Sequence, residues 1–262
     1  MNIKPKKKLG QNFLIDENII KKIVNAVPIS KKNEILEIGA GTGNLTNFLI
    51  KKEPKKIILV EKDRDLFEIL KSKFNNKIEI FNEDILKFSK SNLFTENSII
   101  FGNLPYNISS KILTKFIFNN EKFKFKMLVF MFQKELADRI VAKVNSSNYG
   151  RLTILSNWKF NIYKAFDVSP NSFYPKPKIK SSVLVFNHKD KIIKFKNPKN
   201  LERITSIFFN KRRKKIKKQF NNLFNNNVEI SRILDLDLNL RPQNLSPENY
   251  FNLTQELEKL RD

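Results

Sequence analysis

Cysteine is absent from this 262-residue sequence, and histidine occurs only once, as His188. Without cysteine the chain has no disulfide, no thiolate nucleophile and no cysteine-based zinc site. One histidine does not make a metal-binding cluster, so we expect no metal cofactor. His188 follows the apolar stretch Ser182–Phe186, and no motif supports a serine nucleophile that it would activate. An exposed strand end is the simpler interpretation of this residue.

Long apolar runs are missing as well. No stretch approaches the roughly 18 residues that a membrane-spanning helix needs. The N-terminal segment Met1–Lys8 is basic but lacks the apolar stretch of a secretory signal. We therefore expect a soluble, cytoplasmic protein without a membrane partner, and we expect it to be a monomer.

Acidic residues are few, because 26 Asp and Glu stand against 50 Lys and Arg, which gives a formal net charge of +24. The sequence is also rich in Asn and Ile, as in genomes of low G+C content, and this bias accounts for part of the lysine. It does not account for clusters of lysine, so a polyanionic partner is expected. Hydrophobic residues make up 40% of the chain and include 24 Phe, which argues for a folded core.

Apolar runs typical of strands alternate with helix-like segments over the first part of the chain. This alternation predicts an α/β fold in which a mostly parallel sheet is covered on both faces. The expected strands are Glu34–Ile38, Lys56–Glu61, Ile78–Asn82, Ser98–Gly102 and Met127–Phe132. The expected helices are one capped by Asp16, then Leu45–Lys51, Asp63–Phe74, Ser109–Phe118 and Lys134–Val144.

The pattern changes in the last third. Strands expected near Lys159–Val168 and Lys180–Asn187 are separated by a Pro-rich loop, so the last strand is expected to join the sheet antiparallel. Strand signals then disappear, and helix-like segments follow at 200–210, 213–225, 229–235 and 247–260. We predict two domains, residues 1–189 with the sheet and a small helical one at 190–262.

A glycine-rich turn, Glu37-Ile-Gly39-Ala-Gly41-Thr-Gly43, follows the first predicted strand and precedes a helix. Glycines let the backbone turn sharply and leave room for a ligand against the main chain. The dinucleotide fingerprint requires G-x-G-x-x-G, and its last position is Asn44 here. The turn instead matches the E-x-G-x-G-x-G pattern of S-adenosylmethionine (SAM) methyltransferases, which predicts SAM contacts at Gly39 and Gly41.

Acids follow the next two predicted strands. Glu61 ends the second strand, where a carboxylate can accept both ribose hydroxyls, and Asp84 follows the third, where an acid can accept from the adenine amino group. Either acid alone is easily read as a solvated loop charge. Suitable groups at three consecutive strand ends favour SAM as the cofactor.

The loop Asn103-Leu104-Pro105-Tyr106 closes the fourth predicted strand. It resembles the (N/D)-P-P-(Y/F/W)-like motif of methyltransferases that act on exocyclic amino groups. We expect the Asn103 side chain and the Leu104 carbonyl to accept the two N–H bonds of the base, which stabilises charge that develops on nitrogen. Pro105 would fix the loop and Tyr106 would stack on the base.

Five segments together resemble the small-subunit ribosomal RNA adenine dimethyltransferases, over almost the whole chain. They are Lys8–Leu14, Glu37–Gly41, Phe101–Ser109, Phe173–Ser181 and Phe209–Ile216. The resemblance implies the Rossmann-like class I SAM-dependent methyltransferase fold. It also implies N6,N6-dimethylation of two adjacent adenosines in the 3′-terminal hairpin of small-subunit (16S-type) rRNA, late in assembly of the small ribosomal subunit.

The same resemblance implies roles for individual residues. Asn12 and Leu14 would cover the cofactor, and Asn103 would lie between cofactor and base. Phe173 would stack on the face of the target base opposite Tyr106, although an ordinary core position is nearly as plausible from the sequence.

A basic run, Lys211–Lys218, has cationic side chains at seven of its eight positions. Folding does not require such a cluster and self-repulsion opposes it, so we interpret it as an RNA-binding segment, with Lys4–Lys8 as a further contributor. The expected RNA contacts are Lys211, Arg212, Arg213, Lys214, Lys215, Lys217 and Lys218.

Three other functions compete with this reading. A large-subunit rRNA dimethyltransferase of the macrolide-resistance type would share both half-sites. A non-catalytic rRNA-binding assembly factor on the same fold predicts loss of Asn103, Tyr106, Glu61 or Asp84, all of which are present. An NAD-dependent oxidoreductase is disfavoured by the glycine spacing and by the charge.

Overall fold

The computed structural model describes residues 4–74, 78–119 and 123–260. The chain forms two compact units, one from residues 1–137 and 162–188 and the other from 138–161 and 189–262. Residues 138–161, which the predicted division places with the sheet, thus fold with the C-terminal helices.

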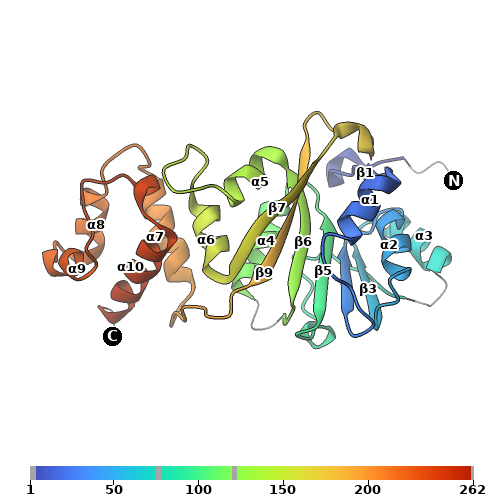
Figure 1. Cartoon of the computed structure of the whole chain (residues 1–262), viewed down its shortest axis with the longest axis horizontal. Coiled ribbons are helices and arrows are strands. Elements are labelled where there is room, and N and C mark those ends of the chain that lie inside the picture. Colours follow the sequence, from blue (N-terminus) through green and yellow to red (C-terminus); the bar gives the residue numbers. More distant parts are fainter. Residues whose placement is uncertain (1–3, 75–77, 120–122, 261–262) are drawn as a thin grey trace. The chain divides into compact units, whose positions relative to one another are not determined.

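A seven-stranded sheet dominates the first unit, in the order β4-β3-β2-β5-β6-β9-β7 (Figure 1). The five strands from β4 to β6 pair in parallel, and β9 pairs antiparallel with β6. The antiparallel last strand is therefore confirmed. The strands are β2 (Glu34–Ile38), β3 (Lys56–Glu61), β4 (Glu79–Asn82), β5 (Ser98–Asn103), β6 (Met127–Gln133), β7 (Phe160–Val168) and β9 (Ser181–His188).

The predicted parallel strands are confirmed to within one residue at each end, and all of them except the edge strand β4 have apolar runs buried on both faces. All five residues of β2 and the five central residues of β6 are buried. The helices between the strands are α2 (Asn44–Ile50), α3 (Arg64–Phe74), α4 (Ser109–Phe118) and α5 (Lys134–Ile140). Within the described residues no helix is both long and apolar enough to cross a membrane.

The first helix, α1 (Glu17–Val24), begins where the Asp16 carboxylate accepts the backbone N–H groups of Asn18 and Ile19, at 3.0 and 3.2 Å. The predicted cap is therefore confirmed. Ser172 also donates to Asp16 at 3.1 Å, so one carboxylate joins the start of α1 to the Pro-rich segment.

A two-stranded ribbon brings the N-terminal segment beside that Pro-rich segment. β1 (Phe13–Leu14) pairs antiparallel with β8 (Phe173–Tyr174). Leu14 and Phe173 lie opposite each other and both belong to the core. The ribbon therefore fixes the N-terminal segment against the sheet unit, a pairing across about 160 residues that no local pattern predicts.

The second unit contains α6 (Arg151–Lys159), α7 (Lys199–Phe209), α8 (Lys217–Phe224), α9 (Val228–Ile233) and α10 (Pro247–Lys259). Helix α6 was not expected from the sequence. It packs against α7 and α10 and is buried on several sides. It therefore lacks the polar stripe that reveals an amphipathic helix. The predicted helix over 213–225 is wrong at its start, because residues 211–213 form a turn and α8 begins at Lys217.

We expect Asp16→Ala to destabilise the protein by about 1 kcal/mol, because two N–H groups at the start of α1 lose their acceptor. Urea unfolding measures this as a lower midpoint at unchanged slope. The matched variant Lys22→Ala, on the exposed side of the same helix, should leave the midpoint within experimental error. Equal midpoints for the two variants would contradict the capping role.

Candidate functional site

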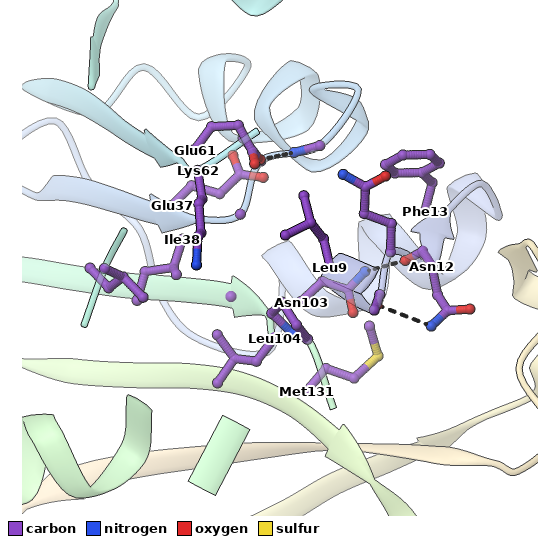
Figure 2. A pocket seen from close by; sticks show the side chains of 18 of the residues that line it. Leu9, Asn12, Phe13, Glu37, Ile38, Glu61, Lys62, Asn103, Leu104 and Met131 are labelled. Atoms are coloured by element: carbon purple, nitrogen blue, oxygen red, sulfur yellow. Dashed lines mark hydrogen bonds between the residues drawn. The ribbon is translucent and has the colours of Figure 1, made fainter. Parts of the chain in front are cut away.

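A pocket lies at the carboxyl ends of β2, β3, β4 and β5, the edge of an open α/β sheet where ligands bind (Figure 2). Every lining residue belongs to the first unit. The wall combines an N-terminal arm (residues 6–14, of which 8–14 line the pocket), the glycine turn, the ends of β3 and β4, and the loop after β5. These segments contribute Lys8–Leu14, Glu37–Thr42, Asn44, Glu61, Lys62, Glu83–Ile85 and Gly102–Ile108, among others.

At two positions that face the pocket, the glycine turn adopts a backbone conformation that residues with a Cβ disfavour. Gly39 and Gly41 have φ of +67° and +59°, in the left-handed region where glycine carries no steric penalty. A Cβ on Gly41 would lie 3.1 Å from the Phe13 ring, whereas one on Gly39 would meet nothing closer than the Asn103 carbonyl at 3.9 Å. Gly39 therefore leaves open backbone beside Asn103, and Gly41 admits the ring of the arm.

Glu61 ends β3 inside the pocket and is 6% exposed. One carboxylate oxygen accepts Gly41 N–H at 3.0 Å and the other accepts Asp63 N–H at 2.9 Å. Burial raises the pKa of Glu61, and these backbone donors offset part of the effect. An ionised carboxylate has about four acceptor sites. Acceptor capacity therefore remains for hydroxyl groups of a ligand.

Glu37, the last acid of β2, is 2% exposed and accepts the Thr46 hydroxyl at 2.7 Å. Burial raises its pKa to about 8, and the neighbouring Glu61 adds to the rise. Glu37 is therefore protonated at neutral pH in the structure as it stands.

Asp84 follows β4 and faces the same pocket. Its carboxylate accepts Leu86 N–H at 2.9 Å and the Lys62 ammonium at 2.8 Å. Partial burial alone would raise the pKa of Asp84, but these bonds hold it below its usual value. Asp84 is consequently an ionised acceptor at the rim of the pocket.

The N-terminal arm is held to the sheet unit by Asp63, which is 4% exposed. Lys6 donates to one oxygen at 2.6 Å and Gln11 to the other at 2.7 Å. Desolvation opposes ionisation of Asp63, but these two partners lower its pKa below the ordinary value. These two hydrogen bonds keep residues 8–12 over the pocket. Sequence reasoning missed the Lys6–Asp63 pair, since the two residues are 57 positions apart.

Asn103 joins the arm to the predicted base-binding loop. Its side-chain Nδ2 donates to the Asn12 carbonyl at 2.9 Å. Next to it, Leu104 is 1% exposed and packs over Gly102, where a Cβ would lie 2.5 Å from the leucine Cδ2. The loop conformation thus depends on buried apolar contacts as well as on Pro105.

Tyr106 completes the loop, and its hydroxyl lies 2.7 Å from the Ser181 hydroxyl at the start of β9. Burial raises the pKa of this phenol, so it stays neutral. Its ring position is fixed at both ends, by the loop backbone and by β9.

The predicted catalytic and cofactor-binding residues gather in one pocket, with one exception. Asn12, Leu14, Gly39, Gly41, Glu61, Asp84 and Asn103–Tyr106 all line it. Phe173 does not. It is 3% exposed and belongs to the hydrophobic core, so this arrangement does not support stacking on a base. Its neighbour Tyr174 is 59% exposed, because successive residues of a strand face opposite ways.

The basic segment Lys211–Lys218 lies in the second unit and is not one continuous helix. Arg212 is tied inward, donating to the carbonyls of Ser146 and Ser147 and to Gln243. The other cationic side chains are exposed: Lys211, Arg213, Lys214, Lys215, Lys217 and Lys218. Arg212 therefore fixes the turn that presents the six exposed cations.

Within the described residues no group of three or more His, Asp or Glu side chains is placed to hold a metal ion.

We expect Glu37→Gln to flatten the pH dependence of stability. The folded protein keeps a proton on Glu37 up to a pKa of about 8, whereas the unfolded chain releases it near 4.5. Stability from this group is therefore lost as the pH rises from 4.5 to 8, by at most ~1.4 kcal/mol per pH unit. Thermal unfolding between pH 6 and 8 should show a smaller fall for Glu37→Gln than for wild type. The exposed variant Glu17→Gln should follow wild type, and parallel curves for all three proteins would contradict the assignment.

A family model for ribosomal RNA adenine dimethylases matches residues 2–259. The sequence is 55% identical to ribosomal RNA small subunit methyltransferase A of Pelagibacter ubique, covering 100% of both chains. It is 39% identical to the protein of the same name from a Wolbachia of Drosophila simulans, covering 98% of this chain and 95% of the relative.

Two solved structures are similar over nearly the whole chain. A dimethyladenosine transferase from Plasmodium falciparum has a TM-score of 0.79 at 28% identity, covering 94% of this chain and 98% of that one. The 23S rRNA methyltransferase ErmE has a TM-score of 0.69 at 22% identity, covering 94% and 99%, and shows a shared fold alone. The family model matches almost the full length of this chain, and a relative at 55% identity spans it from end to end. The chain therefore belongs to the ribosomal RNA adenine dimethylase family.

Proposed function

We propose that this protein transfers methyl groups from SAM to N6 of two adjacent adenosines in the 3′-terminal hairpin of small-subunit rRNA. The product is N6,N6-dimethyladenosine, made late in subunit assembly. Relatives that carry the small-subunit name span the whole chain, and they support this target. We further propose that the enzyme acts as a monomer in the cytoplasm.

The pocket fits SAM through the groups at its strand ends. The remaining acceptor capacity of Glu61 suits a ribose diol, and the ionised Asp84 suits the adenine amino group. Gly39 leaves main chain open to the ligand, while Asn12 and Leu14 lie on the arm that covers it. When bound, SAM supplies a methyl group activated by a sulfonium.

One observation carries the chemistry, namely the orientation of the Asn103 amide. Its Nδ2 donates a hydrogen bond to the Asn12 carbonyl, so Oδ1 is the atom that accepts a hydrogen from the target amino group. The Leu104 carbonyl accepts the second hydrogen. Both acceptors stabilise the positive charge that develops on N6, whose lone pair can then point at the methyl group. The proton leaves to water afterwards, so no strong base is needed.

Tyr106 is proposed to stack on the target base, a contact worth ~1–3 kcal/mol in comparable sites. Its fixed ring supports this role, since a pre-oriented platform loses little entropy when the base arrives. Phe173 is left out of the proposed base contacts, because its ring is covered by the core.

The exposed cations of the Lys211–Lys218 segment are proposed to contact RNA phosphates. Lys211, Arg213, Lys214, Lys215, Lys217 and Lys218 would do so directly. Arg212 would act by fixing the turn, through its bonds to the 146–147 carbonyls.

We expect Asn103→Ala and Glu61→Ala to abolish detectable methyl transfer. For Asn103→Ala, kcat/KM should fall by at least about a hundredfold, because the lost Oδ1 acceptor acts on the charge that develops on N6. RNA affinity should persist in both. Mass spectrometry of rRNA after incubation of undermethylated small subunits with SAM reports base, position and methyl count together. The matched variants Asn18→Ala and Glu17→Ala, exposed on α1, should methylate fully.

The same assay separates the competing functions. Methyl groups that appear only in purified large subunits would overturn the small-subunit target. Full methylation by Asn103→Ala or Glu61→Ala would overturn the site assignment.

The double variant Arg213→Gln/Lys214→Gln should weaken RNA binding. It should also make the negative slope of log affinity against log salt shallower by about 1.5, the effect of two lost phosphate contacts. Filter binding over a range of salt concentrations measures the slope. Lys32→Gln/Lys71→Gln removes the same charge from exposed positions of the sheet unit and should keep it. Equal slopes for the two double variants would count against the segment as the RNA contact.

A further inference from the structure

The segment that carries Asp84 is a single helical turn with nothing to continue it. The backbone N–H groups of Lys87 and Phe88 bond the Asp84 carbonyl at 2.8 and 2.9 Å, and Leu86 N–H bonds the Asp84 side chain. Asp84 therefore satisfies the donors of the turn. The carbonyls at its other end need donors from elsewhere, because no further helical residue follows.

Lys115 supplies those donors from α4. Its ammonium lies 2.7 Å from the Ile85 carbonyl, 3.2 Å from that of Leu86 and 2.5 Å from that of Phe88. Three donors on one ammonium thus meet three carbonyls of one turn. A cation at the carbonyl end of a helical turn is also favourable electrostatically.

The surroundings of Lys115 show that this placement is specific. Its ammonium lies 5.2 Å from the centre of the Phe123 ring. Burial lowers the pKa of Lys115, and the negative charge of Asp84 opposes that shift. A lysine on a solvated face would feel neither effect, so the side chain is held at the turn.

The helix that carries Lys115 also starts at the base-binding loop. Helix α4 begins at Ser109, three residues after Tyr106, and Lys115 lies about two turns further along it. One helix therefore links the loop around Asn103 to the turn around Asp84, which lie at the ends of β5 and β4.

We propose that Lys115 is a positioning residue that holds the 84–88 turn so that Asp84 meets the amino group of the cofactor's adenine. The inference rests on the proposed function, because it takes Asp84 as the adenine acceptor. Lys115 does not line the pocket, and it acts through the backbone of the turn. Without it the Asp84 carboxylate loses its fixed direction, and recognition of the amino group weakens while the rest of the pocket remains.

The test compares two ligands that differ only at that amino group. S-adenosylhomocysteine carries a 6-amino purine, and S-inosylhomocysteine carries a 6-oxo group that an ionised Asp84 repels. Calorimetry on the full-length wild type should give at least about tenfold tighter binding of the amino ligand. Lys115→Met should lose most of that ratio. It should also raise the KM for SAM about tenfold while kcat at saturating SAM changes by less than about twofold.

Matched variants separate positioning from general stability. Lys111→Met removes an exposed lysine one turn earlier on α4 and should keep the wild-type ratio. Lys115→Arg can still donate to the carbonyls and should restore most of it. If Lys115→Met does not fold, Lys115→Gln, which keeps two donors without the charge, takes its place with an intermediate ratio expected. In a double-variant cycle, Asp84→Ala/Lys115→Met should lose no more than Asp84→Ala alone, because both changes remove one interaction.

The outcomes distinguish the inference from its basis. If Asp84→Ala keeps the wild-type ratio, the assignment of Asp84 to adenine is wrong, and the inference falls with it. If Asp84→Ala loses the ratio but a folded Lys115→Met or Lys115→Gln keeps it, Lys115 only stabilises the fold and the inference alone is overturned.

Discussion

The site depends first on the parallel register of four strands. Ile38 of β2 stands opposite Val60 of β3 and Gly102 of β5, and Glu61 stands opposite Asn82 of β4. Since all four strands run the same way, their next residues emerge at one edge. Strands in a sheet are about 4.8 Å apart, so the glycine turn, Glu61, Asp84 and Asn103 fall within roughly 15 Å. Backbone hydrogen bonds thus set the spacing of groups that are far apart in sequence.

A second constraint is the N-terminal arm, which turns that edge into a pocket. The arm is bonded to Asp63 through Lys6 and Gln11, to Asn103 through the Asn12 carbonyl, and to Asn44 through the Leu14 carbonyl. The Asn103 bond engages Nδ2 and leaves Oδ1 for the proposed contact with the target base. Asn12, which we propose covers the cofactor, and Asn103, which we propose orients the base, are therefore parts of one hydrogen-bonded structure.

Much of this was predictable from the sequence, for a local reason. Gly39, Glu61, Asp84 and Asn103 each follow an apolar run, and a parallel sheet converts that local rule into proximity. Contacts made by side chains across the fold were not predictable in this way. The Lys6–Asp63 pair and the Lys115 bonds join residues that share no period, and α6 has no polar stripe to mark it. Phe173 was open to two interpretations because its motif does not say which face of β8 is buried. Pairing with β1 decides this and puts Phe173 inside.

The charges of the pocket and of the surface are opposite, and each suits a different ligand. Five acids line or adjoin the pocket, namely Glu37, Glu61, Asp63, Glu83 and Asp84, in a protein whose net charge is +24. The cofactor carries positive charge at its sulfonium and ammonium, whereas RNA is a polyanion. Not all of these acids carry a negative charge. Burial raises the pKa of Glu37 to about 8, so it stays protonated, and the neighbouring Glu61 adds to the rise. The chain thus keeps negative charge at the strand ends, where the cationic cofactor is proposed to bind, and carries lysines at exposed positions, where they are proposed to contact phosphate.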